Sequence, residues 1–122
     1  MVKKLQFGER IKKLRLEQEL GLRELGRLLK VSAMHLSNLE KGRVMPSAGL
    51  VKKIAVQLGA DIDELLHLAK LIDPQIAEVI QKNPYKAPNF LRSAKNLNEK
   101  QWEKLQKQVE RMAKENEKNG KK

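Results

Sequence analysis

The sequence predicts an all-α protein, and three observations support this fold class. Over residues 5–69, apolar residues recur at intervals of three and four positions, as they do on one face of a helix. Glycine, proline, serine and aspartate interrupt these stretches where helices begin or end. No segment alternates apolar and polar residues over the length of a strand. We expect a compact helical domain over residues 1–69, followed by a helical extension over residues 70–122.

Recognisable signals bound the first three helices. The first should end near Leu20-Gly21, because glycine commonly follows the last turn of a helix. Val31-Ser32 separates the second helix from the third, and Ser32 is a favourable N-cap for the third. Gly42 is the stop signal of the third helix. The apolar residues that define these helices are Phe7, Ile11, Leu14, Leu22, Leu25, Leu28, Leu29, Leu36 and Leu39.

Two further helices complete the domain. Pro46-Ser47 opens the fourth, since proline suits the start of a helix, and Gly59 ends it. Asp61 and Glu64 form the Asp-x-x-Glu pattern of a capping pair before the fifth. The residues expected to face the core from these two helices are Leu50, Ile54, Leu58, Leu65, Leu66 and Ala69.

The extension is expected to begin with one short helix. Asp73-Pro74 combines an N-cap with a proline at the first helical position. A narrow apolar stripe follows on this helix, made of Ile76, Val79 and Ile80.

A loop, a turn and a last helix should follow. Residues 83–88, which include two prolines, are expected to form the loop, and a short turn should occupy residues 90–94. Asn98 and Gln101 have the spacing of a capping box that starts a helix through about Asn116. Residues 119–122 should be frayed.

The charge of the chain points to a partner that carries phosphates. Lys and Arg number 26 against 15 Asp and Glu, which gives a formal net charge of +11. Both nucleic acid and an anionic membrane surface suit this excess. The two regions share it, since residues 1–69 carry 13 basic and 8 acidic side chains (+5) and residues 70–122 carry 13 and 7 (+6).

Other features exclude several classes of protein. The chain has no cysteine, which excludes a disulfide scaffold and a thiolate zinc site and fits a reducing compartment. No apolar run approaches the roughly 18 residues of a membrane span. The lysines at the start are not followed by an apolar stretch, so we expect no secretory signal and a cytoplasmic protein without a membrane partner.

The sequence offers no catalytic or metal-binding constellation. His67 has no second ligand three or four positions away, and His35 suits packing or a phosphate contact better than a metal. Asp61, Asp63 and Glu64 fall in the first turn of a helix, where acids complement the helix dipole. A glycine-rich phosphate loop, a His-Glu-x-x-His motif and a Ser-His-Asp set are all missing. We therefore expect no enzyme, no metal and no cofactor.

Residues 22–42 carry the pattern that bears on function. They predict two short amphipathic helices joined by a tight turn, the second with one apolar face and one face of small polar residues. This is the layout of a helix-turn-helix, whose second helix fits a DNA major groove about 12 Å wide. An ordinary helical hairpin is the alternative.

Over about residues 5–69 the sequence resembles the Xre-type, lambda-repressor-like DNA-binding domains, which implies a five-helix domain of that kind. Three positions depart from the family pattern: Gly21 replaces a Ser or Thr cap, Gly26 replaces a common alanine, and Lys30 replaces the glycine of the turn. Either Lys30 adopts a positive φ at some cost, or the turn differs slightly. The matching positions are Arg15, Glu24-Leu25-Gly26, Leu29, Val31-Ser32, Leu36-Ser37, Leu39-Glu40-Lys41-Gly42, Pro46-Ser47, Leu50, Ile54-Ala55, Leu58-Gly59 and Leu65-Leu66.

The resemblance assigns roles to the third helix and its flanks. By helical periodicity Ala33, Met34, Ser37 and Asn38 face outward, and in the family this face reads bases. Asn38 suits adenine N6 and N7, while Ala33 and Met34 suit a thymine methyl. On an arbitrary helix the same face would be merely solvated. The expected phosphate contacts are Ser32, His35, Lys41 and Arg43.

The resemblance also implies a structural ion pair. Arg15 stands at the end of the first helix and Glu40 at the end of the third. A planar guanidinium suits a partly buried carboxylate near a helix terminus.

The resemblance implies a DNA-binding transcriptional regulator: a repressor that binds an inverted-repeat operator in double-stranded DNA as a homodimer. Two alternatives remain. One is the antitoxin of a toxin–antitoxin pair, whose tail would wrap a partner protein. The other is a protein-bridging transcription cofactor that uses the same fold without base readout. A basic membrane-surface protein is a weaker alternative, because the apolar stripes are too narrow for insertion.

An apolar stripe on the last helix is the expected dimer interface. Its members are spaced 3, 4 and 3 positions apart: Trp102, Leu105, Val109 and Met112. Because tryptophan is costly to expose and the helix is otherwise polar, we expect this stripe to be buried, in part against a partner's tail. The alternatives are packing on the chain's own helices, contact with another protein, and a mostly solvated basic helix.

Overall fold

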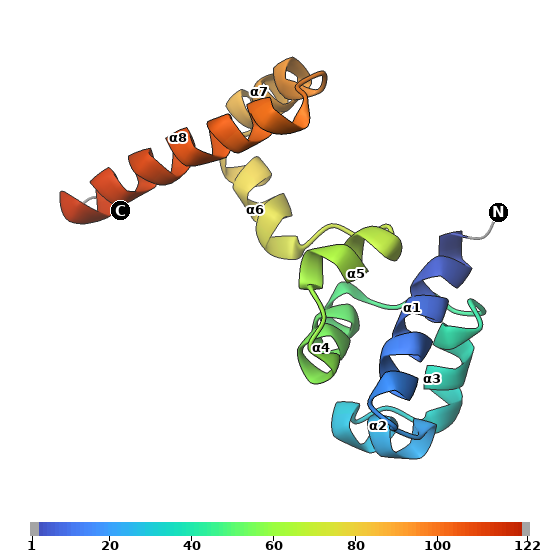
Figure 1. Ribbon diagram of the computed structural model, residues 1–122. Coiled ribbons are helices and arrows are strands. Elements are labelled where there is room, and N and C mark those ends of the chain that lie inside the picture. The colour runs from blue at the N-terminus through green and yellow to red at the C-terminus, as the bar shows by residue number, and fades with distance from the viewer. Residues whose placement is uncertain (1–2, 121–122) are drawn as a thin grey trace. The chain divides into compact units, whose positions relative to one another are not determined.

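The computed structural model describes the backbone of residues 3–120 and the side chains of residues 6–120 (Figure 1). Within that range the chain forms eight α-helices and no strand, which confirms the predicted all-α fold. The chain divides into two compact units, Met1–Val79 and Ile80–Lys122. At the end expected to be frayed, Asn119 and Gly120 form a turn, and residues 121–122 lie outside the described residues.

Five helices form the core of the first unit. They are α1 (Lys3–Glu17), α2 (Leu22–Leu29), α3 (Ala33–Glu40), α4 (Ala48–Leu58) and α5 (Ile62–Leu68). α1 packs against α3, α4 and α5, while α2 packs against α3 and α4 (Figure 1). The largest side chains enclosed between them are Ile11, Leu25, Leu36, Leu39, Val51, Ile54 and Leu65. Two residues expected in this core, Leu14 and Leu50, are only partly buried.

Side-chain caps start three of these helices. The hydroxyl oxygens of Ser32 and Ser47 accept hydrogen bonds from the backbone N–H groups of His35 (3.0 Å) and Leu50 (3.1 Å). Asp61 Oδ1 accepts one from the N–H of Glu64 (3.0 Å). These bonds satisfy N–H groups that have no partner inside the helix, and they explain where α3, α4 and α5 begin.

Glu64 does not form the expected reciprocal pair with Asp61. Its Oε2 atom lies 3.4 Å from Arg10 Nε of α1. The Glu64 carboxylate, which the local pattern assigned to the capping pair, therefore contacts a residue of another helix instead.

α1 ends at Glu17, earlier than the expected end near Leu20-Gly21. The reason is Glu19, which adopts the left-handed conformation with φ 57°. The carbonyl of Arg15 accepts hydrogen bonds from the N–H groups of both Gln18 and Leu20 (3.1 Å each), which closes the last turn. A non-glycine residue thus takes the position where glycine usually ends a helix.

An ion pair attaches the start of α6 (Pro74–Lys82) to α4. Asp73 Oδ1 accepts a hydrogen bond from the N–H of Gln75 (2.9 Å) and lies 2.9 Å from Lys52 Nζ. These two contacts lower the pKa of Asp73, the bond from Gln75 more than the one from Lys52. The expected N-cap is therefore also a tertiary contact.

The prediction of a loop over residues 83–88 and a turn over residues 90–94 is wrong for all but residues 83–85. α7 (Lys86–Ala94) occupies most of this range and leaves only residues 83–85 between it and α6. Pro88 lies in the first turn of α7, where the missing N–H of proline removes no intrahelical bond. Proline alone therefore did not indicate a loop here.

α8 (Glu99–Lys118) begins with the expected capping box and runs slightly beyond Asn116. Asn98 Oδ1 accepts from the N–H of Gln101 (2.8 Å), and Gln101 Oε1 accepts from the N–H of Asn98 (3.0 Å). Among the described side chains of the second unit, Ala94 is the one that is buried. This unit therefore has no enclosed core comparable to that of the first.

Candidate nucleic-acid interface

The third helix presents one face to the core and the other to solvent. Leu36 and Leu39 are buried, and Glu40 also turns inward. On the opposite side the structure brings together the four residues expected to read bases: Ala33, Met34, Ser37 and Asn38. Met34 is 74% exposed and the other three are partly exposed. This outward side of α3 is hereafter the reading face.

The reading face carries no acidic side chain. Within α3, all of which the structure describes, the one acid is Glu40, and it is buried. Beyond the helix, Lys41 and Arg43 are exposed. Since DNA phosphates are anionic, a face without acids beside two cations favours approach of a duplex.

The turn between α2 and α3 depends on two departures from the family pattern. Lys30 adopts φ 63° and ψ 41°, the left-handed conformation expected if the turn is kept. The N–H of Val31 donates to the carbonyl of Gly26 (2.9 Å), and a Cβ on Gly26 would lie 2.6 Å from the Val31 carbonyl oxygen. An alanine at position 26 would therefore force the turn to shift.

The residues expected to contact phosphates flank the reading face. Ser32 and His35 lie at the start of α3, where the Ser32 hydroxyl also caps the helix. Past its other end, Gly42 adopts φ 75°, and the N–H of Arg43 donates to the Asn38 carbonyl (2.9 Å). These backbone bonds fix the segment that carries Lys41 and Arg43.

A buried ion pair positions the end of α3. The structure brings Arg15 and Glu40 together in a bidentate contact, with Nε 2.7 Å from Oε2 and Nη2 3.0 Å from Oε1. Arg15 Nη1 also donates to the Leu20 carbonyl (2.8 Å). The hydrogen bonds to Glu40 raise the pKa of Arg15, although burial opposes them. One guanidinium thus joins α1, the α1–α2 turn and α3.

Gly8, which was not among the residues predicted from the sequence, also determines this geometry. A Cβ at this position would overlap the carbonyl oxygens of Leu39 and Glu40. The absence of a side chain therefore lets α1 lie directly against the end of α3. The available signal was a glycine inside a helix, close to the core residues Phe7 and Ile11, where it is costly unless packing requires it.

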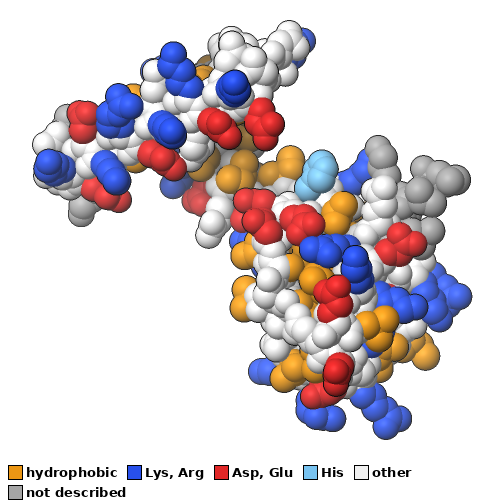
Figure 2. Space-filling model, viewed as in Figure 1, with side chains coloured by type: hydrophobic (Ala, Val, Ile, Leu, Met, Phe, Trp, Pro, Cys, Tyr) orange, Lys and Arg blue, Asp and Glu red, His pale blue; other side chains and the backbone are white. Residues whose placement is uncertain are grey.

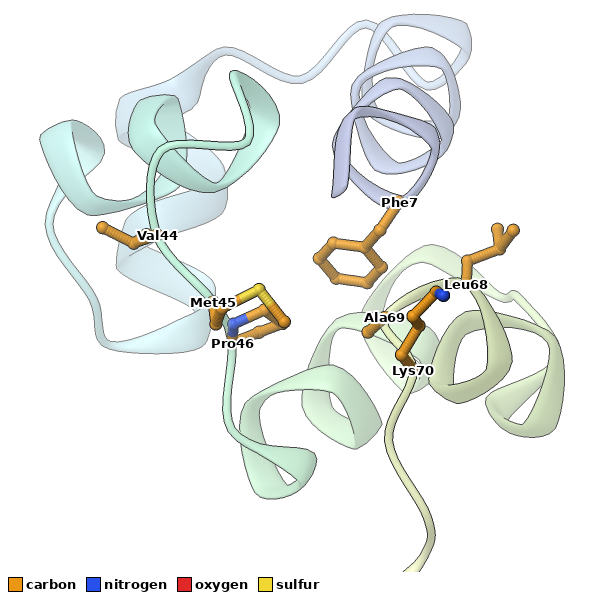
Figure 3. Close-up of a pocket in the computed structure, with 7 residues that line it drawn as sticks. All are labelled: Phe7, Val44, Met45, Pro46, Leu68, Ala69 and Lys70. Carbon is orange, nitrogen blue, oxygen red and sulfur yellow. The ribbon is translucent and has the colours of Figure 1, made fainter. Parts of the chain in front are cut away.

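A small apolar cavity lies beneath the segment that joins α3 to α4 (Figure 3). Its volume is about 90 Å³, and the Phe7 ring points into it toward Met45 and Pro46. Small-molecule sites usually occupy about 300–1,000 Å³, so this cavity does not identify a site for an inducing ligand.

The stripe expected to form a dimer interface lies along one side of α8. Trp102 is 43% exposed, Val109 and Met112 are also exposed, and Leu105 is partly buried.

Lys and Arg side chains are distributed over both units, without a single basic patch on the visible face (Figure 2).

The described residues contain no group of three or more His, Asp and Glu placed to hold a metal ion. None of the described helices is both long enough and apolar enough to cross a membrane.

Comparisons with known proteins bear on the family. The HTH-type transcriptional regulator DdrOP3 of Deinococcus deserti is 32% identical over 73 residues, which cover 60% of this chain and 57% of that protein. The chain thus matches little more than half the length of this curated relative. The crystal structure of the clp gene regulator ClgR from Corynebacterium glutamicum is similar in fold, with a TM-score of 0.50 and 24% identity over 77% of this chain and 94% of that chain. Residues 6–68, more than half of the chain, match the model of the helix-turn-helix domain, and the chain belongs to that family.

Proposed function

We propose that this chain is a sequence-specific DNA-binding transcriptional regulator that places α3 in the major groove. One observation carries the proposal: the reading face has no acid and is flanked at both ends by residues suited to phosphates. Membership of the helix-turn-helix family and similarity to a protein named as a transcriptional regulator support it. In this proposal the chain acts by binding and not by catalysis.

Base contacts and phosphate contacts have separate roles in the proposal. Asn38 pairs with an adenine edge, and Ala33 and Met34 contact a thymine methyl. Ser37 is the fourth residue of the reading face that contacts bases. The residues proposed to hold the backbone are Ser32, His35, Lys41 and Arg43. Phosphate contacts supply affinity without sequence preference, whereas base contacts supply the preference.

We propose that residues 1–69 bind DNA and that residues 70–122 bind a second copy of the chain. Ala69 is the last residue of the buried core cluster, which supports this boundary. The exposed apolar stripe of α8 supports association with a second copy. A homodimer reads an inverted repeat, and in this proposal it represses by occupying the operator.

Selection of bound duplexes from a random pool tests the proposal. We expect one enriched sequence with two inverted half-sites, whose centres lie about 10–10.5 base pairs or a multiple apart. Ser37→Glu, which adds an acid to the reading face, should abolish enrichment, whereas Gln81→Glu, with the same change of charge on α6, should not.

Other outcomes would contradict the proposal. Salt-sensitive binding without any enriched sequence would favour the protein-bridging cofactor. Enrichment of single half-sites by a monomeric chain would remove the homodimer and favour a tail that binds another protein, as in an antitoxin.

A further inference from the structure

The groove between α2 and α4 has an apolar floor that no part of the first unit covers. It is open, has a volume of about 460 Å³, and lies between the end of α2 and one side of α4. Leu28 of α2 is 49% exposed and Val56 of α4 is 74% exposed. An aliphatic side chain placed between these two residues would bury apolar surface on both of them.

The sides of this groove are basic. Lys30 lies on the α2 side and Lys53 on the α4 side, together with Lys52, which already contacts Asp73. No acidic residue lines the groove, and none of the ion pairs of the described residues involves Lys30 or Lys53. Two cations therefore stand beside the apolar floor without a carboxylate partner.

Lys30 adopts a backbone conformation that is unfavourable for lysine. It is the left-handed residue of the α2–α3 turn, at φ 63°, where glycine would be unstrained. The same residue lines the groove. Retained strain of this kind is more frequent at positions that bind something than at neutral surface positions.

We propose that this groove docks an acidic segment of a partner protein. In the complex, an aliphatic side chain of the partner lies between Leu28 and Val56, and its carboxylates bind Lys30 and Lys53. A second copy of the chain is a poor source of such a segment, because its acidic stretch at residues 61–64 already caps α5 and contacts Arg10, and because its net charge is +11. DNA suits the groove less, since a phosphate backbone gains nothing from an apolar floor.

The groove is separate from the reading face, because no residue of α3 lines it. The groove and the reading face are therefore made of different residues, with Lys30 two positions before Ser32. The proposal does not depend on the proposed function, since the groove would dock its partner whether or not α3 reads bases.

Titration of the isotope-labelled full chain with a synthetic amphipathic helix tests the proposal. The probe carries leucines on one face and glutamates elsewhere, and the control peptide carries lysines in place of the glutamates. We expect amide shifts confined to the neighbourhood of Leu28, Lys30, Lys53 and Val56, weaker binding as salt rises, and no shifts with the control.

Charge reversal sharpens the test. Lys53→Glu should weaken the acidic probe at least about tenfold, whereas Lys13→Glu, the same change on the exposed side of α1, should leave it unchanged. The double variant Lys30→Glu/Lys53→Glu should instead bind the basic control peptide. Thermal unfolding of each variant establishes that it is folded.

Several results would overturn the proposal. One is a set of shifts on α3, or no shifts at all. Another is equal weakening by Lys13→Glu and Lys53→Glu, which would indicate attraction by overall charge. Displacement of the probe by duplex DNA at the same amides would assign the groove to phosphates instead.

Discussion

The two units of the chain differ in how far their apolar side chains are buried. In the first unit, Ile11, Leu36 and Ile54 are almost completely buried, and five helices close around them. In the second, Trp102 and Met112 remain exposed on α8. Burial of apolar surface is the main stabilising term for helices of this length. We infer that the first unit is stable through its own contacts, whereas the second depends on an added surface.

The largest effect is expected when the Arg15–Glu40 ion pair of the first unit is broken. Glu40→Ala leaves the Arg15 guanidinium buried without its carboxylate, and we expect a loss of about 3–5 kcal/mol in the free energy of unfolding. Denaturant titration measures it. Glu17→Ala, which removes an exposed acid from the same part of α1, should change stability by less than about 0.5 kcal/mol. Equal midpoints for Glu40→Ala and the unchanged protein would show that the pair does not hold α3.

The next largest effect is expected on association of the second unit through α8. Trp102→Ala removes the largest side chain of the α8 stripe, and we expect the proposed dimer to weaken by about 2 kcal/mol, or roughly thirtyfold. Sedimentation over a range of concentrations measures it. Lys107→Ala, on the opposite side of α8, is the control and should leave the dimer intact. A full chain that stays monomeric at every concentration would contradict the inference that α8 pairs with a second copy.

A smaller effect concerns backbone strain in the first unit. Lys30→Gly relieves a left-handed side chain, and we expect a gain of about 1 kcal/mol in the free energy of unfolding. Lys41→Gly is the control, because Lys41 has φ −87° and no such strain. Thermal unfolding compares the two. A loss of stability in Lys30→Gly would show that the lysine side chain contributes more than the strain removes.

The smallest effect is expected at Asp73, which precedes α6 within the first unit. Its pKa is lowered in the folded state, so the ionised carboxylate stabilises the fold above the ordinary pKa of about 3.9, and this contribution is lost as pH falls through the lowered folded value. Asp73→Asn keeps an N-cap but removes the charge opposite Lys52.

We therefore expect Asp73→Asn to be slightly less stable than the unchanged protein at neutral pH and equal to it in acid below the folded pKa. Denaturant midpoints across this range measure the difference, with Asp63→Asn on α5 as the control. A difference that persists unchanged in strong acid would assign the effect to the cap and not to the ion pair.

Local signals predicted the first unit well because its helices begin and end at side chains that act within three residues. Ser32, Ser47 and Asp61 each cap the helix that follows them, as expected from their position alone. The reading face followed from periodicity in the same way, since Leu36 and Leu39 fix which side of α3 is buried.

The errors arose where a distant residue or an unusual conformation decided the outcome. Glu64 contacts Arg10 in another helix, which no local pattern reveals. Glu19 ends α1 in a conformation that normally indicates glycine. Pro88 was compatible with a helix because it falls in the first turn, a position that is known only once the start of α7 is known. The groove residues Lys30 and Val56 are far apart in sequence, so no pattern joined them.

The most direct test of base reading by α3 compares Asn38→Ala with Lys41→Ala on the selected duplex and on random DNA. If the reading face specifies sequence, Asn38→Ala costs about 1–3 kcal/mol on the selected duplex, changes binding to random DNA little, and relaxes the preference at one base. Lys41→Ala should weaken both complexes alike and lower the slope of log K against log salt by about one. Equal weakening of both complexes by Asn38→Ala would contradict base reading by this face.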